Sequence, residues 1–284
     1  MLLTVITVLA LLCSVAALLS GGIWAGIVAF VGGWIGWLMV ALLVLLIAAA
    51  LVDTNKEEEE DSGFYRYMTH LWIEFVIAVG RMKIRTQGLE KIPTDGRFLL
   101  VCNHLSDIDP GILMHCFPKS QLAFIGKKET KNMPIIGPVM QKLLCQFINR
   151  ENVREALKTI LMCIQIVKED KASIGVFPEG YVSLDGKLRH FRGGVFKIAQ
   201  KANVPVVVCT LRDSKKAMDR LLKLKSSETE VHLVEVISAE EVKSMSTVEL
   251  GERIYESMIS DLGEKYRTDE KGMHPDRQRQ RMEQ

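Results

Sequence analysis

The first 52 residues form a continuous apolar stretch, and the first charged side chain is Asp53. One helical crossing of a bilayer needs about 20 apolar residues, so this stretch is long enough for a hairpin of two. Ser20-Gly21-Gly22 and Gly32-Gly33 are the two places that favour a bend. A secretory signal peptide has a basic start and a shorter apolar run, which this stretch lacks. We therefore expect residues 1–52 to be a transmembrane helical hairpin, or one that dips into the bilayer without crossing it.

A short acidic segment and a second apolar segment follow. Residues 53–63 include Lys56 and then Glu57 to Asp61, which predicts a solvated acidic linker. In residues 64–81, apolar side chains recur at helical spacing. This pattern predicts an interfacial or amphipathic helix, and an ordinary core helix remains open.

From Gly88 onward, short apolar runs alternate with helical patterns. The runs that predict buried strands are Phe98–Cys102, Leu122–Ile125, Gln146–Ile148, Ile174–Phe177, Val204–Leu211 and Val231–Ile237. Asn152 with Glu155, and Ser246 with Glu249, are typical of capped helix starts. Strands that alternate with helices predict an α/β fold with a mixed, largely parallel sheet flanked by helices. We expect residues 82–268 to form the catalytic domain and residues 269–284 to be a polar tail.

Charge and cysteine content exclude some alternatives. Residues 1–81 carry a net charge of −4 against +2 for the whole chain, which leaves +6 for residues 82–284. A moderately basic domain beside a membrane suits anionic lipids and substrates. The six cysteines form no Cys-x-x-Cys pair, so we expect neither a disulfide framework nor a metal site.

The segment Phe98–Pro110 is the strongest candidate for chemistry. A buried strand ends there, and His104 and Asp109 follow it. Ligands bind at such strand ends in open α/β sheets. A histidine held by a carboxylate is a general base that can take a proton from an alcohol. The alternative is that Asp109 only caps the helix that begins at Pro110.

Two further segments carry polar groups. In Gly175–Gly180, a strand runs into a tight turn that places Glu179 at the sheet edge, ahead of Gly193-Gly194 and a predicted helix. Clustered cations and helix starts bind phosphate, and the cations here are Lys187, Arg189, His190, Arg192 and Lys197. In Lys127–Arg150, basic residues bracket an apolar stretch with two prolines.

Taken together, these segments resemble the 1-acyl-glycerol-3-phosphate acyltransferase family of PlsC-like glycerolipid acyltransferases, over roughly residues 82–240. The family's four motifs fall in order on Asn103, His104 and Asp109; on Lys127, Glu129, Pro134, Gly137 and Arg150; on Phe177 to Gly180 with Ser183; and on Val204-Pro205-Val206.

The resemblance implies a mechanism. His104, oriented by Asp109, would deprotonate the sn-2 hydroxyl of 1-acyl-glycerol-3-phosphate, which attacks the thioester of acyl-CoA or acyl-carrier protein. Glu179, Gly180 and Ser183 would shape the acceptor site, and Lys127 and Arg150 would bind its phosphate. The product is phosphatidate, for phospholipid biosynthesis. No cofactor, metal or nucleic acid is implied.

The sequence departs from the family pattern at several positions. Val182 stands where the family has an arginine associated with phosphate binding, and Lys187, Arg189 or Arg192 would have to compensate. The other departures are Thr130, Leu144 and Asn149 in the second motif and Val208 in the fourth.

These departures leave alternatives open. One is an acyltransferase for another lysophospholipid or an acylated amino-acid lipid. A hydrolase using Ser106 lacks the Gly-x-Ser-x-Gly elbow, and a catalytically inactive membrane scaffold would not need His104 and Asp109. Since both thioester donors are cytosolic, we expect an integral membrane protein with its catalytic domain on the cytosolic side, at the plasma membrane if the source is bacterial.

Overall fold

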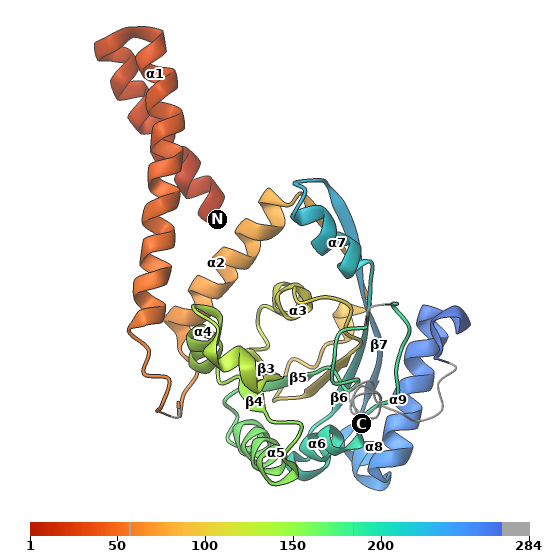
Figure 1. The fold of residues 1–284 in the computed structure, drawn as a ribbon. Helices are drawn as coiled ribbons and strands as arrows, with labels where there is room; N and C mark the ends of the chain where they lie inside the picture. Colours follow the sequence, from red (N-terminus) through yellow and green to blue (C-terminus); the bar gives the residue numbers. More distant parts are fainter. Residues whose placement is uncertain (57, 184, 269–284) are drawn as a thin grey trace, which may run out of the picture.

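The computed structural model describes residues 1–56, 58–183 and 185–268, so the predicted polar tail at 269–284 lies outside the described residues. The apolar stretch is helical over α1 (Leu2–Ala50), which is interrupted at Gly22 by a φ of 76° and a ψ of −174°. Glycine tolerates this backbone without steric cost. Ser14 Oγ donates to the carbonyl oxygen of Gly26 at 2.8 Å, so the two arms lie against each other. Figure 1 shows the resulting hairpin extending away from the rest of the molecule.

The hairpin exposes its apolar side chains. Leu19 is 83% exposed and Trp24 is 76% exposed, beside the bend. In the most apolar window of α1, 11% of the residues are buried. At 1.5 Å per residue, the shorter arm is about 30 Å long, close to the thickness of a bilayer's hydrocarbon core. By length and composition, this segment is able to cross a membrane.

The acidic segment after α1, predicted to be a solvated linker, is exposed at Asp53, Lys56, Glu59 and Glu60 and is tied to the protein at two other carboxylates. Asp61 is paired with Arg66 at 2.7 Å, and its side chain is only 7% exposed. Glu58 pairs with Lys142 at 2.6 Å, and Ser62 N donates to the carbonyl oxygen of Lys142 at 3.0 Å. Arg66 lies close to Asp61 in the sequence, whereas Lys142, the partner of Glu58, comes from a distant segment that the local pattern did not reveal.

Helix α2 (Gly63–Val79) lies between the hairpin and the α/β domain. Tyr65 donates from its hydroxyl to the carbonyl oxygen of Ala48 at 2.8 Å, which ties α2 to the end of α1. Arg66 donates to the carbonyl oxygen of Leu122 in the sheet at 3.1 Å. Phe64 and Tyr67 are more than half exposed on the outer side. The helix is therefore anchored on one side and apolar on the other.

Within the described residues, seven strands form one sheet in the order β1-β7-β6-β2-β5-β3-β4. All neighbouring strands are parallel except β6 and β7, which agrees with the predicted mixed, largely parallel sheet. The strands are β1 (Met82–Gln87), β2 (Leu99–Cys102), β3 (Leu122–Lys127), β4 (Gln146–Ile148), β5 (Ser173–Val176), β6 (Val206–Arg212) and β7 (Ser227–Ile237). Edge strand β1 was not predicted, because its alternation of Met, Lys, Ile and Arg is weakly apolar.

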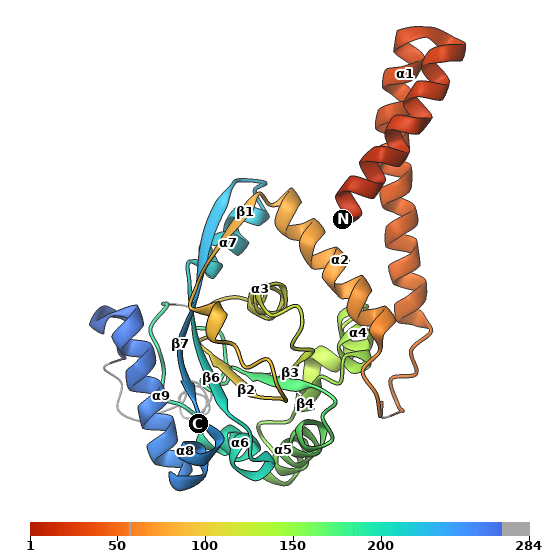
Figure 2. The same cartoon turned by 180° about the vertical axis from the view of Figure 1, so that it is seen from behind.

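Helices cover the sheet (Figures 1 and 2). They are α3 (Asp109–Cys116), α4 (Ile136–Lys142), α5 (Val153–Lys168), α6 (Lys197–Ala202), α7 (Ser214–Leu221), α8 (Ala239–Ser244) and α9 (Thr247–Leu262). Short 3₁₀ turns lie at Leu89–Lys91, Lys128–Asn132, Gly193–Phe196 and Glu264–Tyr266. Asn152 caps α5 through its side chain, and Ser246 with Glu249 forms a capping box on α9, as predicted.

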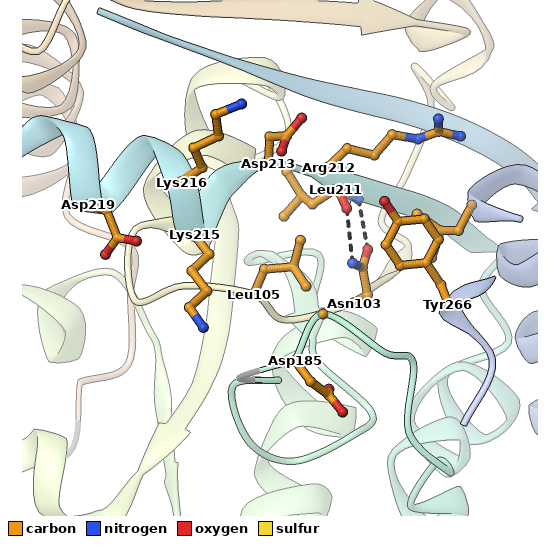
Figure 3. A pocket seen from close by; sticks show the side chains of 12 residues that line it. Asn103, Leu105, Asp185, Leu211, Arg212, Asp213, Lys215, Lys216, Asp219 and Tyr266 are labelled. Carbon is orange, nitrogen blue, oxygen red and sulfur yellow. Dashed lines mark hydrogen bonds between the residues drawn. The ribbon is translucent and has the colours of Figure 1, made fainter. Parts of the chain in front are cut away.

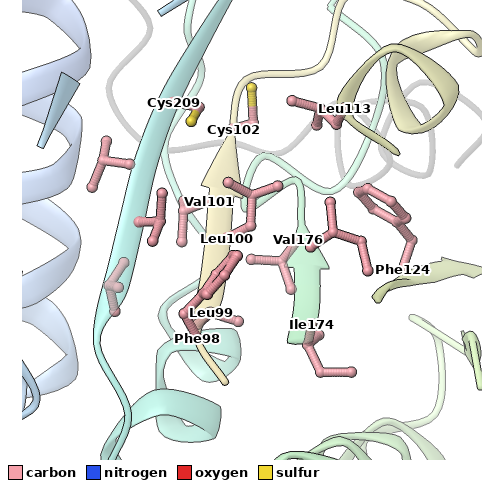
Figure 4. Close-up of a cluster of buried hydrophobic side chains, with 14 of the residues drawn as sticks. Phe98, Leu99, Leu100, Val101, Cys102, Leu113, Phe124, Ile174, Val176 and Cys209 are labelled. Carbon is pink, nitrogen blue, oxygen red and sulfur yellow. The ribbon is translucent and has the colours of Figure 1, made fainter. Parts of the chain in front are cut away.

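The core lies along the two central strands. β2 and β5 are buried over their whole length, which requires cover on both faces. Figure 4 shows the side chains of Phe98, Leu100, Phe124 and Val176 gathered around these strands. Because β2, β5, β3, β4 and β6 run parallel, their carboxyl ends meet at one edge of the sheet. This packed centre gives that edge a rigid base.

Candidate active site

His104 and Asp109 meet at the carboxyl end of β2. His104 Nδ1 lies 2.9 Å from Asp109 Oδ2, and the Asp109 side chain is fully buried while that of His104 is 16% exposed. The structure records no partner for Nε2 of His104 within the described ranges 1–56, 58–183 and 185–268. A histidine whose Nδ1 is held by a buried carboxylate presents Nε2 as a base. This geometry can accept a proton from a hydroxyl group.

Asp109 is not the N-cap of helix α3, and its carboxylate has other partners. Helix α3 starts at Asp109 itself, after Ile108, with Pro110 in the first turn. Its Oδ2 accepts from the backbone N–H groups of Leu105 and Ser106 at 2.7 and 2.8 Å, besides the contact with His104. These bonds close the turn that brings the carboxylate back to His104. The capping interpretation of Asp109 is therefore wrong.

Glu179 fixes the backbone on either side of the site. Its Oε1 accepts from the N–H of His104 at 2.9 Å, and its Oε2 accepts from the N–H of Arg189 at 2.9 Å. The side chain is fully buried. Burial raises the pKa of Glu179 to about 8, against the opposing effect of the two N–H donors. Glu179 thus joins the β5 turn to the histidine rather than facing solvent.

An aromatic stack supports the imidazole ring. Phe177 lies parallel to His104, with ring centroids 4.1 Å apart, and Phe124 stacks on Phe177 at 5.8 Å. Phe124 occupies space that a Cβ on Gly175 would fill, so Gly175 permits the stack. The Phe-Pro-Glu-Gly segment therefore contributes a ring as well as a carboxylate.

The turn after Glu179 brings an arginine close to the site. Gly180 has a φ of 83°, which favours glycine, and a Cβ there would lie 3.0 Å from Arg192 Nε. Arg192 N also donates to the carbonyl oxygen of Pro178 at 2.9 Å. The Arg192 side chain therefore passes directly over the turn.

Ser183 is fully buried beside that turn. Its N–H donates to the carbonyl oxygen of His104 at 2.7 Å, and its hydroxyl donates to the carbonyl oxygen of Lys187 at 2.8 Å. It holds the loop in place next to the histidine.

Lys127 and Arg150 lie further along the same edge. Lys127 ends β3 and is exposed, and Arg150 lies two residues beyond β4, which pairs with β3. At the usual strand spacing of about 4.8 Å, β3 lies roughly 10 Å from β2. The two cations therefore flank the His104–Asp109 pair from the β3–β4 side.

Asn103 is a site residue to which the sequence assigned no role. Its amide donates to the carbonyl oxygen of Leu211 at 3.0 Å and accepts from the Leu211 N–H at 2.7 Å, joining the ends of β2 and β6 (Figure 3). A polar amide at the end of a fully apolar strand was the available signal.

A pocket of about 270 Å³ adjoins the site on the β6 side. Asn103 and Leu105, the neighbours of His104 in the chain, line one wall, and Arg212 and Lys215 line another. Figure 3 shows Lys215 and Lys216 leaving α7 in different directions. Such a space suits part of a substrate rather than a whole one, since ligand pockets usually exceed about 300 Å³.

Ser106 is placed differently from a nucleophile. It is 5% exposed, and its hydroxyl accepts from Ile108 N at 3.5 Å. In the part of the chain that the structure describes, Ser106 forms no hydrogen bond with His104, and no group of three or more His, Cys, Asp or Glu side chains is placed to hold a metal ion.

Comparison with known proteins places the site within a matched region. Residues 83–212 match the family model described as acyltransferase. The chain is 30% identical over 162 residues to a probable 1-acyl-sn-glycerol-3-phosphate acyltransferase of Mycoplasma pneumoniae, covering 56% of this chain and 60% of that protein. It is 33% identical over 182 residues to a chloroplastic 1-acyl-sn-glycerol-3-phosphate acyltransferase of Arabidopsis thaliana, covering 64% and 49%. The chain thus spans about half to three fifths of the length of these curated relatives.

A solved structure shares the fold. The crystal structure of the 1-acyl-sn-glycerophosphate acyltransferase PlsC from Thermotoga maritima aligns with a TM-score of 0.56 and 20% identity, covering 94% of this chain and all of that chain. The predicted α/β architecture with an N-terminal apolar helical segment is therefore confirmed.

Proposed function

We propose that this protein transfers a fatty acyl group from a thioester to the sn-2 hydroxyl of 1-acyl-glycerol-3-phosphate, forming phosphatidate; the match of residues 83–212 to the acyltransferase family model supports this reaction class. The observation that carries the proposal is the pairing of His104 Nδ1 with the buried Asp109 carboxylate. Curated relatives bear the name of this activity, which supports the choice of acceptor.

The chemistry needs one base. Nε2 of His104 takes the hydroxyl proton as the oxygen attacks the thioester carbonyl carbon. The C–S bond then breaks, and the departing thiolate receives the proton from the imidazolium, so that an ester and a free thiol result. Asp109 stabilises the positive charge on the ring during this step. Such base assistance is typically worth roughly 10²–10⁴ in rate.

The acceptor phosphate needs cations. We assign this task to Lys127 and Arg150, with Arg192 in place of the arginine that Val182 replaces. Arg192 is the best placed of the three compensating candidates, because it lies over Gly180. Arg189 donates to Asp185 at 2.6 Å and to Thr268 at 3.2 Å.

The membrane supplies both the acceptor and the anchor. The exposed apolar side chains of the α1 hairpin suit insertion into lipid. Met1 pairs through its amino group with Glu74 at 3.2 Å, which supports a topology with the start of the hairpin on the same side as the α/β domain. We place that side in the cytosol, where acyl-CoA and acyl-carrier protein are found. Either thioester remains a candidate donor.

An activity assay on reconstituted protein tests the proposal. Labelled oleoyl-CoA and oleoyl-acyl-carrier protein are each offered with lysophosphatidate or lysophosphatidylcholine, and the His104→Ala variant serves as the control. Product from lysophosphatidate that depends on His104 supports the proposal. Product from lysophosphatidylcholine alone would keep the chemistry and move the acceptor, as the Val182 replacement allows. If no product forms with any combination of donor and acceptor, the proposed acyltransferase activity is wrong.

A further inference from the structure

The loop that follows α7 exposes two leucines. Leu222 is 75% exposed and Leu224 is 63% exposed, and the lysines Lys223 and Lys225 alternate with them. Single exposed apolar residues are common on protein surfaces, but a pair at the tip of one loop among cations is a distinct feature. We refer to residues 222–226 as the Leu-Lys loop.

Hydrogen bonds fix the backbone of the loop in a conformation that exposes the two leucines. Leu224 has a φ of 51°, a left-handed conformation that leucine rarely adopts. Arg81 donates to the carbonyl oxygen of Leu224 at 2.6 Å, and Arg220 donates to that of Ser226 at 2.8 Å. Strained backbone persists where surrounding contacts fix it. The loop therefore presents its leucines to the surroundings instead of folding them inward.

The charge around the loop has one dominant sign. Residues 214–226 contain five Lys or Arg and one Asp, a net charge of +4. Arg81, which follows α2, and Lys83, in β1, lie beside the loop, and both side chains are exposed. Cations that surround apolar side chains match a surface that is anionic outside and apolar beneath.

The Leu-Lys loop is continuous with the membrane-facing part of the molecule. The Leu221 side chain packs against the backbone of Gly80 at the end of α2. Ser227, which follows the loop, pairs with Met82 at the start of β1. Since β6 and β7 are antiparallel, the loop lies at the sheet edge that holds His104. Figures 1 and 2 show this connection on the side of the domain toward which the α1 hairpin extends.

We infer that the Leu-Lys loop is a second membrane contact, which binds anionic phospholipid with its lysines and buries Leu222 and Leu224 at the acyl boundary. Each basic residue near an anionic surface strengthens binding roughly fivefold. The inference rests on the α1 hairpin lying in a membrane and does not require the acyl-transfer reaction.

Fluorescence of the full chain in vesicles tests the inference without an activity readout. The fluorophore NBD is attached to Leu224→Cys, in a background in which Cys13 and Cys116 are alanine and the buried cysteines are kept. Val248→Cys is the matched control, because Val248 is 65% exposed and α9 begins beyond the opposite sheet edge. Leu222→Cys replaces Leu224→Cys if that variant does not fold.

In vesicles of phosphatidylcholine and phosphatidylglycerol, we expect the NBD emission at position 224 to be blue-shifted. Lipids that carry a nitroxide in the acyl chain should quench this emission. Position 248 stays water-like, and the shift at 224 declines in phosphatidylcholine alone. Equal, unquenched emission at 224 and 248 would overturn the inference. A shift that grows with protein concentration and resists the nitroxide lipids would also overturn it, in favour of contact with a second copy.

Discussion

The side-chain amide of Asn103 forms two hydrogen bonds with the backbone of Leu211, one to its N–H at 2.7 Å and one to its carbonyl oxygen at 3.0 Å. The amide therefore takes the place of a strand pair where β2 ends and the chain turns toward His104. This links the orientation of the histidine to β6, one strand away.

Replacing Asn103 by alanine is expected to leave both Leu211 groups unpaired. Buried groups without partners cost about 1–3 kcal/mol of unfolding free energy. We also expect a lower kcat with a smaller change in KM, because the chain next to His104 loses one of its anchors while the bonds to Glu179 and Ser183 remain. Thermal unfolding and steady-state kinetics check both effects. Asn55→Ala, at an exposed asparagine, should change neither, and full activity in Asn103→Ala would contradict a positioning role.

Replacing His104 by alanine removes the imidazole and is expected to lower the turnover rate by a factor of roughly 10²–10⁴ without unfolding the protein. The His104 backbone stays held by Glu179 and Ser183, so the turn should keep its shape in the alanine variant. Asp109→Asn should also reduce kcat strongly, because an amide cannot stabilise the imidazolium. Rates of acyl transfer and near-native melting temperatures check this prediction.

Ser106→Ala is the matched control for the covalent alternative. Since its hydroxyl contacts only the local turn and not His104 among the described residues, we expect transfer rates close to those of the unaltered protein. Complete loss of activity in this variant would instead indicate an acyl-serine intermediate.

Glu179 is expected to make stability depend on pH. Its folded pKa, about 8, lies above the ordinary value of 4.5, so the folded state keeps a proton that the unfolded chain releases. The contribution of Glu179 to the free energy of unfolding should therefore be largest at low pH. It should fall by about 1–4 kcal/mol as the pH rises from 4.5 to about 8. Unfolding of the Glu179→Gln variant, measured at several pH values, should show a flatter dependence. An equal slope in both proteins would mean that Glu179 ionises normally.

Arg192 and Val182 are expected to act in opposite directions. Losing a charged hydrogen bond to phosphate costs about 1.5–3 kcal/mol, so Arg192→Gln should lower kcat/KM for lysophosphatidate roughly tenfold or more. Val182→Arg should raise kcat/KM, since it restores a cation beside the turn. Kinetics with varied lysophosphatidate check both variants. Unchanged kcat/KM in Arg192→Gln would assign the phosphate to Lys127 and Arg150 alone.

Much of the fold was predictable because it depends on local patterns. The strand at Gln146–Ile148 was predicted to the residue, and β2, β5 and β6 within two residues, because their apolar runs are unbroken. Strand β7 begins at Ser227 rather than Val231, since its first residues alternate between buried and exposed. The pairing of β7 with β1 joins two segments that are far apart in the sequence, so the local pattern did not reveal it.

The candidate site was predictable in its residue types but not in its connections. His104, Asp109 and Glu179 carry recognisable motifs. The stacking of Phe177 on His104 and the Asn103–Leu211 bridge depend on which strands become neighbours, and that order is set by packing of the whole sheet. The placement of Asp109 inside α3 rather than before it depended on the three contacts of its Oδ2 oxygen.

Two ion pairs of the acidic segment between α1 and α2 bear on how the proposed acyltransferase would meet a lipid acceptor. Asp61 pairs with Arg66 of α2 and Glu58 pairs with Lys142 of α4, so the α1 hairpin is joined to the rest of the chain by ion pairs as well as by the backbone. With the α1 hairpin in a membrane, as we propose, these ion pairs would hold His104 at a constant distance from the bilayer plane. An acceptor lipid would then reach the site by lateral diffusion within the membrane.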